Sequence, residues 1–573
     1  MSENFFLDNP DLLFRLEQLD LREVVELKED HYAESGTCAT APRNYADAKD
    51  NYRIVLDVLG EVCAERVAPR AAEADEEGAH YDGGEVTYAA ATLEAIEALR
   101  QADLFGAMLS RRYGGLNLPE SVFQMMVEIV ARAESGLMTV YGLQEIASSI
   151  EEYGDPETKA RVLPRFARGE VSGAMVLTEA DAGSDLGAVA TRATLDEATG
   201  QWHLNGVKRF ITNGLADVSL VLARSEEGST DARGLSLFLV ERDPTVKIRR
   251  IENKLGIHAS PTCEIQYANT PAILIGKRRF GLMRYSMNLM NGARLAVAAQ
   301  ALGIAEAAFR EADRYARERI QFGRPIRSLP AVARLLLSMR VDLEATRALL
   351  AETGRWVDLW KVYEHAVDER GPDADPATRA RHRGCQALAE TLTPMVKYCA
   401  TEMGNRVCNQ AMQVHGGVGY MHEFNIERLF RDVRVTNIYE GTSQLQVVAA
   451  IGKLLSRSLD PLLTEWRAAG YPADMAAEQA ALCDLTARFD DAVGALKGVP
   501  ERDRVDYYAV DLVEMAIGLV GGWLLLRDTN VAEEKKPVAR AYVAALEPKV
   551  RSAAEVILAA NPAPLEAIAA LIR

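Results

Sequence analysis

The sequence predicts an α+β fold that is mostly α, and two changes of pattern along the chain predict it. Apolar residues recur at helical spacing over residues 51–170, short β-rich runs occupy residues 171–276, and helical spacing returns from about residue 277. With 573 residues, 48% of them hydrophobic and 26% charged, the composition is typical of a globular protein of several domains. We therefore expect an N-terminal helical domain, a small antiparallel β-domain, a C-terminal helical bundle and an extra helical domain at the end.

The first 170 residues divide into an extension and a helical domain. Residues 1–50 are polar and acidic apart from one apolar patch at residues 5–21, and we assign them no chemistry. From residue 51 the apolar positions recur every three or four residues, as at Ile54, Val58 and Val62. Breaks that contain glycine separate these segments. We therefore expect residues 51–170 to form the N-terminal helical domain.

Residues 171–276 predict the β-domain. Short β-rich runs occupy residues 201–204, 207–212, 220–223, 235–240 and 246–251. Asn205-Gly206 separates the first two runs, and this dipeptide favours the tight turn of a hairpin. We therefore expect a small antiparallel sheet that contains a hairpin at Asn205-Gly206.

The remaining residues predict two further helical regions. Residues 277–455 include a long alanine-rich run over residues 295–320 that has almost no helix breakers. Residues 356–391 contain Gly371-Pro-Asp-Ala-Asp-Pro376 and indicate an insertion between two helices. Alanine-rich helical segments continue over residues 456–573, which we expect to form an additional C-terminal helical domain.

The charge balance argues against a nucleic-acid partner. The chain has 65 basic and 83 acidic residues, which gives a net charge of -18. Residues 456–573 alone carry 13 basic and 18 acidic residues. Such a surface repels the phosphates of nucleic acids and of anionic lipids.

Cysteine usage and hydropathy indicate the compartment. The seven cysteines form no C-x-x-C pair, so neither a zinc site nor a disulfide framework is expected. The start of the chain is acidic, whereas a signal peptide begins with basic residues and an apolar run. The longest apolar run near the end, residues 515–526, is about 12 residues long and too short to cross a bilayer. We expect a cytoplasmic protein with no membrane span.

Tyr439-Glu440-Gly441-Thr442-Ser443-Gln444 places a carboxylate directly before a glycine and two hydroxyl residues. A partly buried glutamate beside glycine backbone suits removal of a proton from carbon while a flat cofactor lies alongside. By itself such a hexapeptide is more typical of a helix boundary than of an active site. Three further segments favour the active-site interpretation.

Two of these segments belong to the predicted β-domain. An apolar run ends at Thr178 and enters a loop with Gly183 and Ser184, which offers hydroxyls and backbone N–H groups to a ligand. In Lys208-Arg-Phe-Ile-Thr-Asn-Gly214, Phe210 suits shielding of an aromatic cofactor, and Thr212 suits a hydrogen bond to it.

The third joins two pieces of the helical half, Arg319-Ile-Gln-Phe-Gly-Arg-Pro-Ile326 and Gln413-Val-His-Gly-Gly-Val-Gly-Tyr420. Polar side chains beside glycine suit a pyrophosphate and a ribose. Gly417-Val-Gly419-Tyr-Met-His422 has histidine where a dinucleotide fingerprint has its third glycine, so a Rossmann fold is not expected.

These motif regions, in order between residues 52 and 451, resemble those of the acyl-CoA dehydrogenase family. The resemblance implies an FAD-dependent oxidoreductase that converts an acyl-CoA thioester to a 2-enoyl-CoA. It implies that Glu440 removes the α-proton, that the Glu440 N–H and a flavin ribityl hydroxyl bind the thioester carbonyl, and that the β-hydride passes to flavin N5. It implies no metal.

The same resemblance assigns further residues. Residues 319–322 and 413–417 would bind the ADP end of FAD held by a neighbouring subunit, and His415 is expected to pack near the flavin rather than to catalyse. The expected substrate contacts are Ser184, Arg294, Tyr439 and Gly441. The expected FAD contacts are Leu177, Thr178, Gly183, Ser184, Phe210, Thr212, Arg319, Gln321, Phe322, Gln413, Gly416, Gly417, Thr442 and Gln444.

The chain departs from the family pattern at three positions. Ala293 occupies the second place where family members carry the base, and it cannot accept a proton. This leaves Glu440 as the one of the two sites able to act. Phe210 stands where many members have tryptophan, and Pro330 stands near the place of a glutamine that contacts the cofactor.

Two alternatives to a main-pathway dehydrogenase are a nucleic-acid-associated homologue and a membrane-anchored one. The acidic C-terminal region disfavours the first, and the self-neutralised Glu533-Glu-Lys-Lys536 cluster disfavours the second. The resemblance also implies an electron-transferring flavoprotein as electron acceptor and a homodimer, with a homotetramer as the alternative. The acyl-chain preference depends on residues such as Tyr141, Gln144, Leu289 and Met290, and a sequence does not give their distances.

Overall fold

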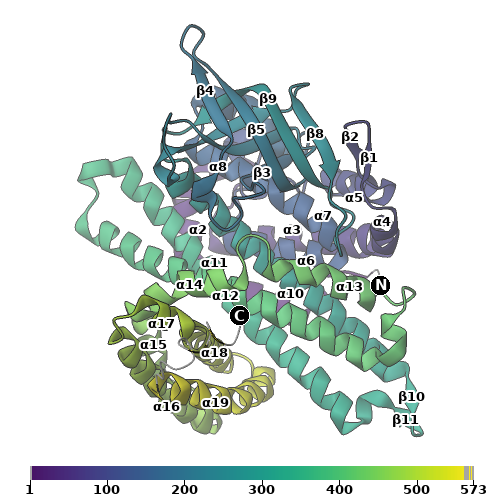
Figure 1. Cartoon of the computed structure of the whole chain (residues 1–573). Helices are drawn as coiled ribbons and strands as arrows, with labels where there is room; N and C mark the ends of the chain where they lie inside the picture. The colour runs from purple at the N-terminus through teal and green to yellow at the C-terminus, as the bar shows by residue number, and fades with distance from the viewer. Residues whose placement is uncertain (1–2, 560–566, 568–569, 571–573) are drawn as a thin grey trace. The chain divides into compact units, whose positions relative to one another are not determined.

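The computed structural model describes residues 3–559, 567 and 570, and Figure 1 shows a mostly helical chain with one larger sheet. The predicted α+β fold class is confirmed. The chain forms two compact units. The first unit comprises Met1–Ala307 and Met421–Val435, and the second comprises Ala308–Tyr420 and Thr436–Arg573.

The helices of the first unit begin at residues that cap them. Asn9, Asn44 and Asp155 each accept backbone N–H groups of the first turn, and Pro156 takes the first helical position of α9. The helices of this part are α1 (Pro10–Gln18), α2 (Arg22–Lys28), α3 (Tyr45–Val62), α4 (Ala71–Glu77), α5 (Ala90–Gln101), α6 (Glu120–Ala133), α7 (Ser135–Gly142), α8 (Ile146–Tyr153) and α9 (Pro156–Ala167).

The β-domain is a seven-stranded sheet in the first unit, and Figure 1 shows β5, β8 and β9 side by side. The strands run in the order β3-β6-β4-β5-β9-β7, and β8 also pairs with β9. Most pairs are antiparallel, as predicted, but β3 and β4 each run parallel to β6. The strands are β3 (Gly173–Val176), β4 (Arg192–Asp196), β5 (Gln201–Thr212), β6 (Val218–Arg224), β7 (Leu235–Glu241), β8 (Val246–Ile251) and β9 (Thr262–Ile275).

The hairpin predicted at Asn205-Gly206 is wrong. Residues 201–212 form one continuous strand, β5, which pairs with β9 along its length. The register shifts between Leu204 and Asn205, so the dipeptide marks a bulge rather than a turn. A Cβ added to Gly206 would lie 2.5 Å from Thr191 Oγ1, so this glycine permits a close approach of the neighbouring chain. Two short hairpins occur elsewhere, β1 (His80–Asp82) with β2 (Glu85–Thr87) and β10 (Ile320–Gln321) with β11 (Arg324–Pro325).

Long helices dominate the rest of the chain. α10 (Met287–Glu318) covers all but the last two residues of the predicted alanine-rich run 295–320, and α11 (Pro330–Arg370) and α12 (Pro376–His415) occupy both halves of the predicted insertion. Residues 356–391 are thus the ends of two helices joined at Gly371–Asp373, because no breaker precedes Gly371 and Asp375 caps the next helix. The remaining helices are α13 (Ile426–Val433), which belongs to the first unit, α14 (Ser443–Leu455), α15 (Asp460–Ala468), α16 (Ala476–Lys497), α17 (Arg502–Tyr507), α18 (Ala509–Asp528) and α19 (Lys536–Ala559).

One helix of the second unit corrects the membrane argument made from length. α18 has 20 residues rather than about 12, so by length and composition it is able to cross a membrane. However, 83% of its apolar window is buried, and it packs against α11, α16 and α19. It therefore has the burial of a core helix. Part of the predicted additional domain, residues 560–566, 568, 569 and 571–573, lies outside the described residues.

Candidate functional site

The loop before α14 in the second unit holds Glu440 in an unusual backbone conformation. Glu440 has φ of 54° and Gly441 has φ of 90°. A left-handed conformation costs a residue with a side chain about 1–2 kcal/mol, so other contacts must maintain it. Thr442 then caps α14, because its side-chain oxygen accepts the Leu445 N–H at 3.4 Å. Tyr439 and Glu440 are half-buried.

Two buried side chains hold the carbonyls of this loop. Lys397 on α12 is fully buried, and its Nζ donates to the Gly441 carbonyl at 2.7 Å. Gln446 Nε2 donates to the Gly441 carbonyl at 3.0 Å and to the Glu440 carbonyl at 3.3 Å. Neither residue belongs to a sequence motif, because Lys397 is isolated in a helical segment and Gln446 lies two residues beyond the 439–444 hexapeptide. Lys397 and Gln446 therefore hold the backbone on which Glu440 is mounted.

A second group of predicted residues surrounds the end of β3 in the first unit. The Leu177 side chain is 4% exposed in the core, so only its backbone is able to face a ligand. Buried Lys208 donates to the Leu177 carbonyl at 2.8 Å and pairs with Glu179 at 2.9 Å. Burial lowers the pKa of Lys208 to about 8, and the negative charge of Glu179 opposes this shift. This pair fixes the turn that carries Thr178.

The structure brings the predicted cofactor contacts Thr178 and Phe210 together. The Arg209 N–H, next to Phe210, donates to the Thr178 carbonyl at 3.0 Å. Phe210 has φ of 60° and a side chain that is 51% exposed, although it is a large apolar ring. Thr178 and Thr212 are half-buried.

The loop after Thr178 is open. Ser184 is exposed, and a Cβ added to Gly183 would meet no described atom within 4 Å. The exposed ring of Phe210, half-buried hydroxyls and open glycine backbone form a surface suited to a flat aromatic ligand.

The predicted ADP-binding residues lie in one part of the second unit. Tyr315, near the end of α10, stacks on His415 at the end of α12 with ring centroids 4.6 Å apart. Arg319, Gln321 and Phe322 belong to the exposed β10–β11 hairpin that follows α10. Phe322 is 89% exposed at its tip, and Arg319 and Arg324 form no ion pair with any described residue.

The end of α12 leaves its backbone accessible. Gln413 is exposed, and at Gly416 and Gly417 an added Cβ would meet nothing within 4 Å among the described atoms. Gly416 has φ of 64° and ends the helix. His415 is buried, its Nδ1 lies 2.8 Å from the Ala411 carbonyl, and burial lowers its pKa. It is packed rather than presented to solvent.

The predicted substrate residue Arg294 lies on α10 in the first unit. It is half-buried, and its Nη1 donates to Asn291 Oδ1 at 3.0 Å. Tyr141 and Gln144, expected to shape the acyl site, line two adjoining cavities of the same unit.

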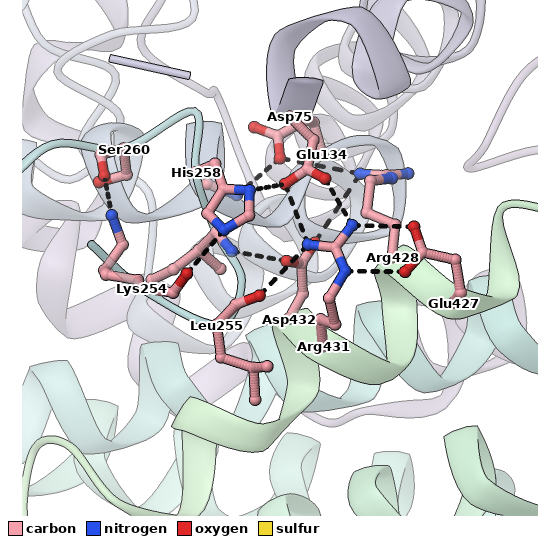
Figure 2. Close-up of polar contacts among 12 residues, drawn as sticks. Asp75, Glu134, Lys254, Leu255, His258, Ser260, Glu427, Arg428, Arg431 and Asp432 are labelled. Carbon is pink, nitrogen blue, oxygen red and sulfur yellow. Dashed lines mark hydrogen bonds and ion pairs between the residues drawn. The ribbon is translucent and has the colours of Figure 1, made fainter. Parts of the chain in front are cut away.

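An ion-pair network not foreseen from the sequence anchors α13 within the first unit, as Figure 2 shows. Arg431 Nη2 lies 2.6 Å from Asp75 on α4, and its Nε lies 2.8 Å from Glu427. His258 contacts Asp75 through Nδ1 at 3.0 Å and the Lys254 carbonyl through Nε2 at 2.8 Å. Both ring nitrogens thus face acceptors, which suits the charged imidazolium, and the hydrogen bond to Asp75 raises the pKa of His258.

The network continues to the start of α7. The buried carboxylate of Asp432 accepts the Ile257 N–H at 2.6 Å, and Arg428 lies 3.8 Å from Glu134, which caps α7. Burial raises the pKa of Glu134 to about 7, and Arg428 opposes this shift. In the sequence, α13 ends seven residues before Glu440. Among the residues that the structure describes, no cluster of histidine, cysteine, aspartate and glutamate suits a metal ion.

Four family models match consecutive parts of the chain. They are described as "Acyl-CoA dehydrogenase, N-terminal domain" over residues 49–170, "Acyl-CoA dehydrogenase, middle domain" over residues 174–270, "Acyl-CoA dehydrogenase, C-terminal domain" over residues 283–360 and 374–453, and "Acyl-CoA dehydrogenase C terminal" over residues 460–565. The third match omits residues 361–373, the tip of the α11 and α12 pair.

Individual proteins agree with these matches. A 3-methylmercaptopropionyl-CoA dehydrogenase of Ruegeria pomeroyi is 34% identical over 440 residues, which are 71% of each chain. A structure described as "Electron transferring flavoprotein of Acidaminococcus fermentans" is 29% identical, with a TM-score of 0.60 over 70% of this chain and 97% of that one. A Bacillus anthracis acyl-CoA dehydrogenase complexed with FAD has a TM-score of 0.76 over 89% of this chain and 88% of its own, and at 22% identity the likeness concerns the fold.

Proposed function

The chain belongs to the acyl-CoA dehydrogenase family, and from this premise we propose that it is an FAD-dependent enzyme that oxidises the C2–C3 bond of an acyl-CoA thioester. The observation that carries the proposal is the strained loop at Glu440, held by buried Lys397 and Gln446. Strain of this kind persists where neighbouring contacts enforce it, and it gathers at active sites. Glu440 is the proposed base.

The residues around the cofactor motif fit FAD. Phe210 offers an exposed ring, Thr178 and Thr212 offer hydroxyls, and the open backbone at Gly183 permits close approach. The exposed β10–β11 hairpin and the end of α12 offer guanidinium groups and open glycine N–H groups, the partners that a pyrophosphate prefers. FAD, when bound, supplies the acceptor for the hydride that leaves C3.

Proton removal is the step assigned to this chain's own residues. The α-proton of a thioester is a weak acid, so its removal needs a positioned, partly desolvated base and donors for the charge that develops on the thioester oxygen. Glu440 takes the α-proton, and its own backbone N–H is one proposed donor to the thioester oxygen. Lys397 and Gln446 bind the carbonyls of Glu440 and Gly441 and so fix the planes of these peptide groups. They therefore also fix the direction in which the Glu440 side chain projects from the backbone. Ala293, at the alternative position, has no group that accepts a proton.

Partners follow from the same proposal. A homodimer would place the exposed hairpin of one subunit, with Phe322 at its tip, against the FAD of the other. A similar solved chain comes from a structure whose description names an electron transferring flavoprotein, and this association supports such a protein as the electron acceptor. All seven cysteines are free thiols, which supports a reducing cytoplasm.

The test is reduction of bound flavin by acyl-CoA without oxygen. Wild-type protein should carry FAD and bleach with at least one acyl-CoA of a chain-length series. Glu440→Gln should keep FAD but slow bleaching about 10²- to 10⁴-fold, the usual contribution of a general base. Glu423→Gln, at an exposed glutamate outside the loop, is the matched control and should bleach normally. Normal bleaching by Glu440→Gln would remove the base assignment, and absence of FAD from wild-type protein would remove the proposed function.

A further inference from the structure

Two adjoining cavities of the first unit share three lining residues, Phe105, Tyr141 and Gln144. The larger has a volume of about 170 Å³ and lies between α5 and α7. The smaller, of about 20 Å³, reaches Glu145 and Ser148. Whole small-molecule sites measure about 300–1,000 Å³, so these cavities suit one end of a ligand rather than all of it.

The walls are mostly apolar, and their polar residues are Gln144 and Glu145 together with Ser148 of the smaller cavity and Glu170, Ser172 and Asp217 of the larger one. Phe105 and Phe123 flank the Tyr141 ring, and the Tyr141 hydroxyl donates to the Leu104 carbonyl at 2.8 Å. The Gln144 side-chain oxygen is buried and has no hydrogen-bond partner among the described residues. A buried acceptor left unpaired costs about 1–3 kcal/mol, so a site that retains one is adapted to a ligand that donates to it.

Glu145 extends this polar lining toward α10. A Cβ added to Gly292 would lie 3.5 Å from Glu145 Oε2, and no other described atom beyond its own helix would lie within 4 Å. The carboxyl group therefore borders open space at Gly292, two residues before Arg294. Burial first, and then the negative charge of Glu120, raise the pKa of Glu145 well above its usual range. No hydrogen bond or ion pair joins the Glu145 carboxyl to another described residue.

We propose that Gln144 and Glu145 form a subsite for a hydrogen-bond-donating group, a hydroxyl or an ammonium, carried near the end of the substrate's acyl chain. The inference rests on the proposed function, because it requires that the acyl chain of a CoA thioester enter along α10. A hydroxyl would donate to the Gln144 oxygen and accept from the protonated Glu145 carboxyl. An ammonium would instead donate to both and hold Glu145 ionised. A plain hydrocarbon tail would leave both polar groups unpaired, and sites built to bond a polar group reject analogues that lack it.

The experiment compares three CoA thioesters whose acyl chains have the same number of heavy atoms and end in methyl, hydroxyl and ammonium groups: heptanoyl-CoA, 6-hydroxyhexanoyl-CoA and 6-aminohexanoyl-CoA. kcat/KM is measured for each with an artificial electron acceptor, in the wild-type holoenzyme and in Glu145→Leu and Glu145→Gln. Leucine removes the polar group at similar size, and glutamine keeps hydrogen bonding without charge. FAD content and the thermal midpoint verify that each variant folds.

Wild type should prefer a polar tail over the methyl tail by about tenfold or more, and Glu145→Leu should reduce that ratio to about one or below. If Glu145→Gln keeps the preference for a polar tail, the bound group is a hydroxyl. If Glu145→Gln loses that preference and the wild-type enzyme prefers the amino substrate, the bound group is an ammonium. Equal or lower activity on both polar tails in wild type, or a ratio unchanged in Glu145→Leu, would overturn the subsite. Failure of all three thioesters to reduce the flavin, with butyryl-CoA and octanoyl-CoA also inactive, would instead count against the proposed function.

Discussion

Replacement of Lys397 by methionine tests whether a buried lysine holds the Glu440 loop. Methionine keeps the length and apolar stem of the side chain but cannot donate to the Gly441 carbonyl, 2.7 Å from Nζ. Lys397 is fully buried. A lysine at the protein surface could therefore take over its hydrogen bond only if helix α12 shifted. Gln446 would remain as a donor to the same carbonyl at 3.0 Å.

The expected magnitude follows from two opposing energies. A hydrogen bond from a charged donor contributes about 1.5–3 kcal/mol, and a side-chain-bearing residue at positive φ costs about 1–3 kcal/mol. Because the energy of the hydrogen bond is similar to the cost of the positive φ, the loop of Lys397→Met should relax toward other backbone conformations once that hydrogen bond is lost. At about 1.4 kcal/mol per factor of ten, the rate of proton removal should fall about 10- to 100-fold.

The assay is anaerobic stopped-flow reduction of the flavin by a saturating acyl-CoA. The limiting rate should fall while the apparent substrate affinity changes little, since Lys397 acts on the orientation of the base rather than on the CoA thioester. Lys453→Met is the matched control, because Lys453 lies on α14 of the same unit and pairs with Glu390 away from the loop. If folded, FAD-loaded Lys397→Met reduced its flavin within twofold of the wild-type rate, the positioning role would be wrong.

Three further outcomes follow from the structure. The hydrogen bond to Asp75 raises the pKa of His258. The free energy by which charged His258 stabilises the fold is therefore complete below its ordinary pKa of about 6.5 and is lost as the pH rises through the raised pKa. The thermal midpoint of His258→Gln should therefore differ most from wild type at mildly acid pH and converge with it at alkaline pH; a gap that widens with pH would contradict the assignment. Gly206→Ala should destabilise the first unit by about 1–3 kcal/mol in denaturant unfolding, because its Cβ would lie 2.5 Å from a threonine hydroxyl oxygen, whereas Gly494→Ala, in open space on α16, should not destabilise. Arg319→Ala should weaken FAD binding about 10- to 100-fold in a titration of apoprotein, and unchanged affinity would show that this guanidinium does not contact the cofactor.

Much of the fold was predictable because its signals are local. The strand at residues 246–251 and the run now seen as α10 each carry their own periodicity, which neighbours reinforce but do not create. The hairpin at Asn205-Gly206 failed because a turn dipeptide is only a preference, and pairing with β9 along all of β5 overrode it. The insertion predicted within residues 356–391 agrees with the C-terminal family model, which omits residues 361–373, and in the structure α11 continues through this segment as a helix up to Gly371.

The residues of the candidate site also fall into two groups, those that stand in a local sequence motif and those that do not. Glu440, Phe210 and Thr178 could be proposed as site residues from the sequence because they stand in compact motifs with glycine and hydroxyl neighbours. Lys397 and Glu145 could not, since a lysine or glutamate within a helical segment has the pattern of a solvated residue until the fold buries it. Burial and the nearest charges decide the chemistry of such side chains, and neither is written in the local sequence.

The order of residues alone determined the mostly helical architecture and the motif that carries the proposed base. Only the tertiary structure decided which polar groups support the proposed base and which line the cavities beside Tyr141. The physical reason is that periodicity and composition are sums over neighbouring residues, whereas a contact such as that between Lys397 and Gly441 joins positions 44 residues apart and exists only after the helices have packed.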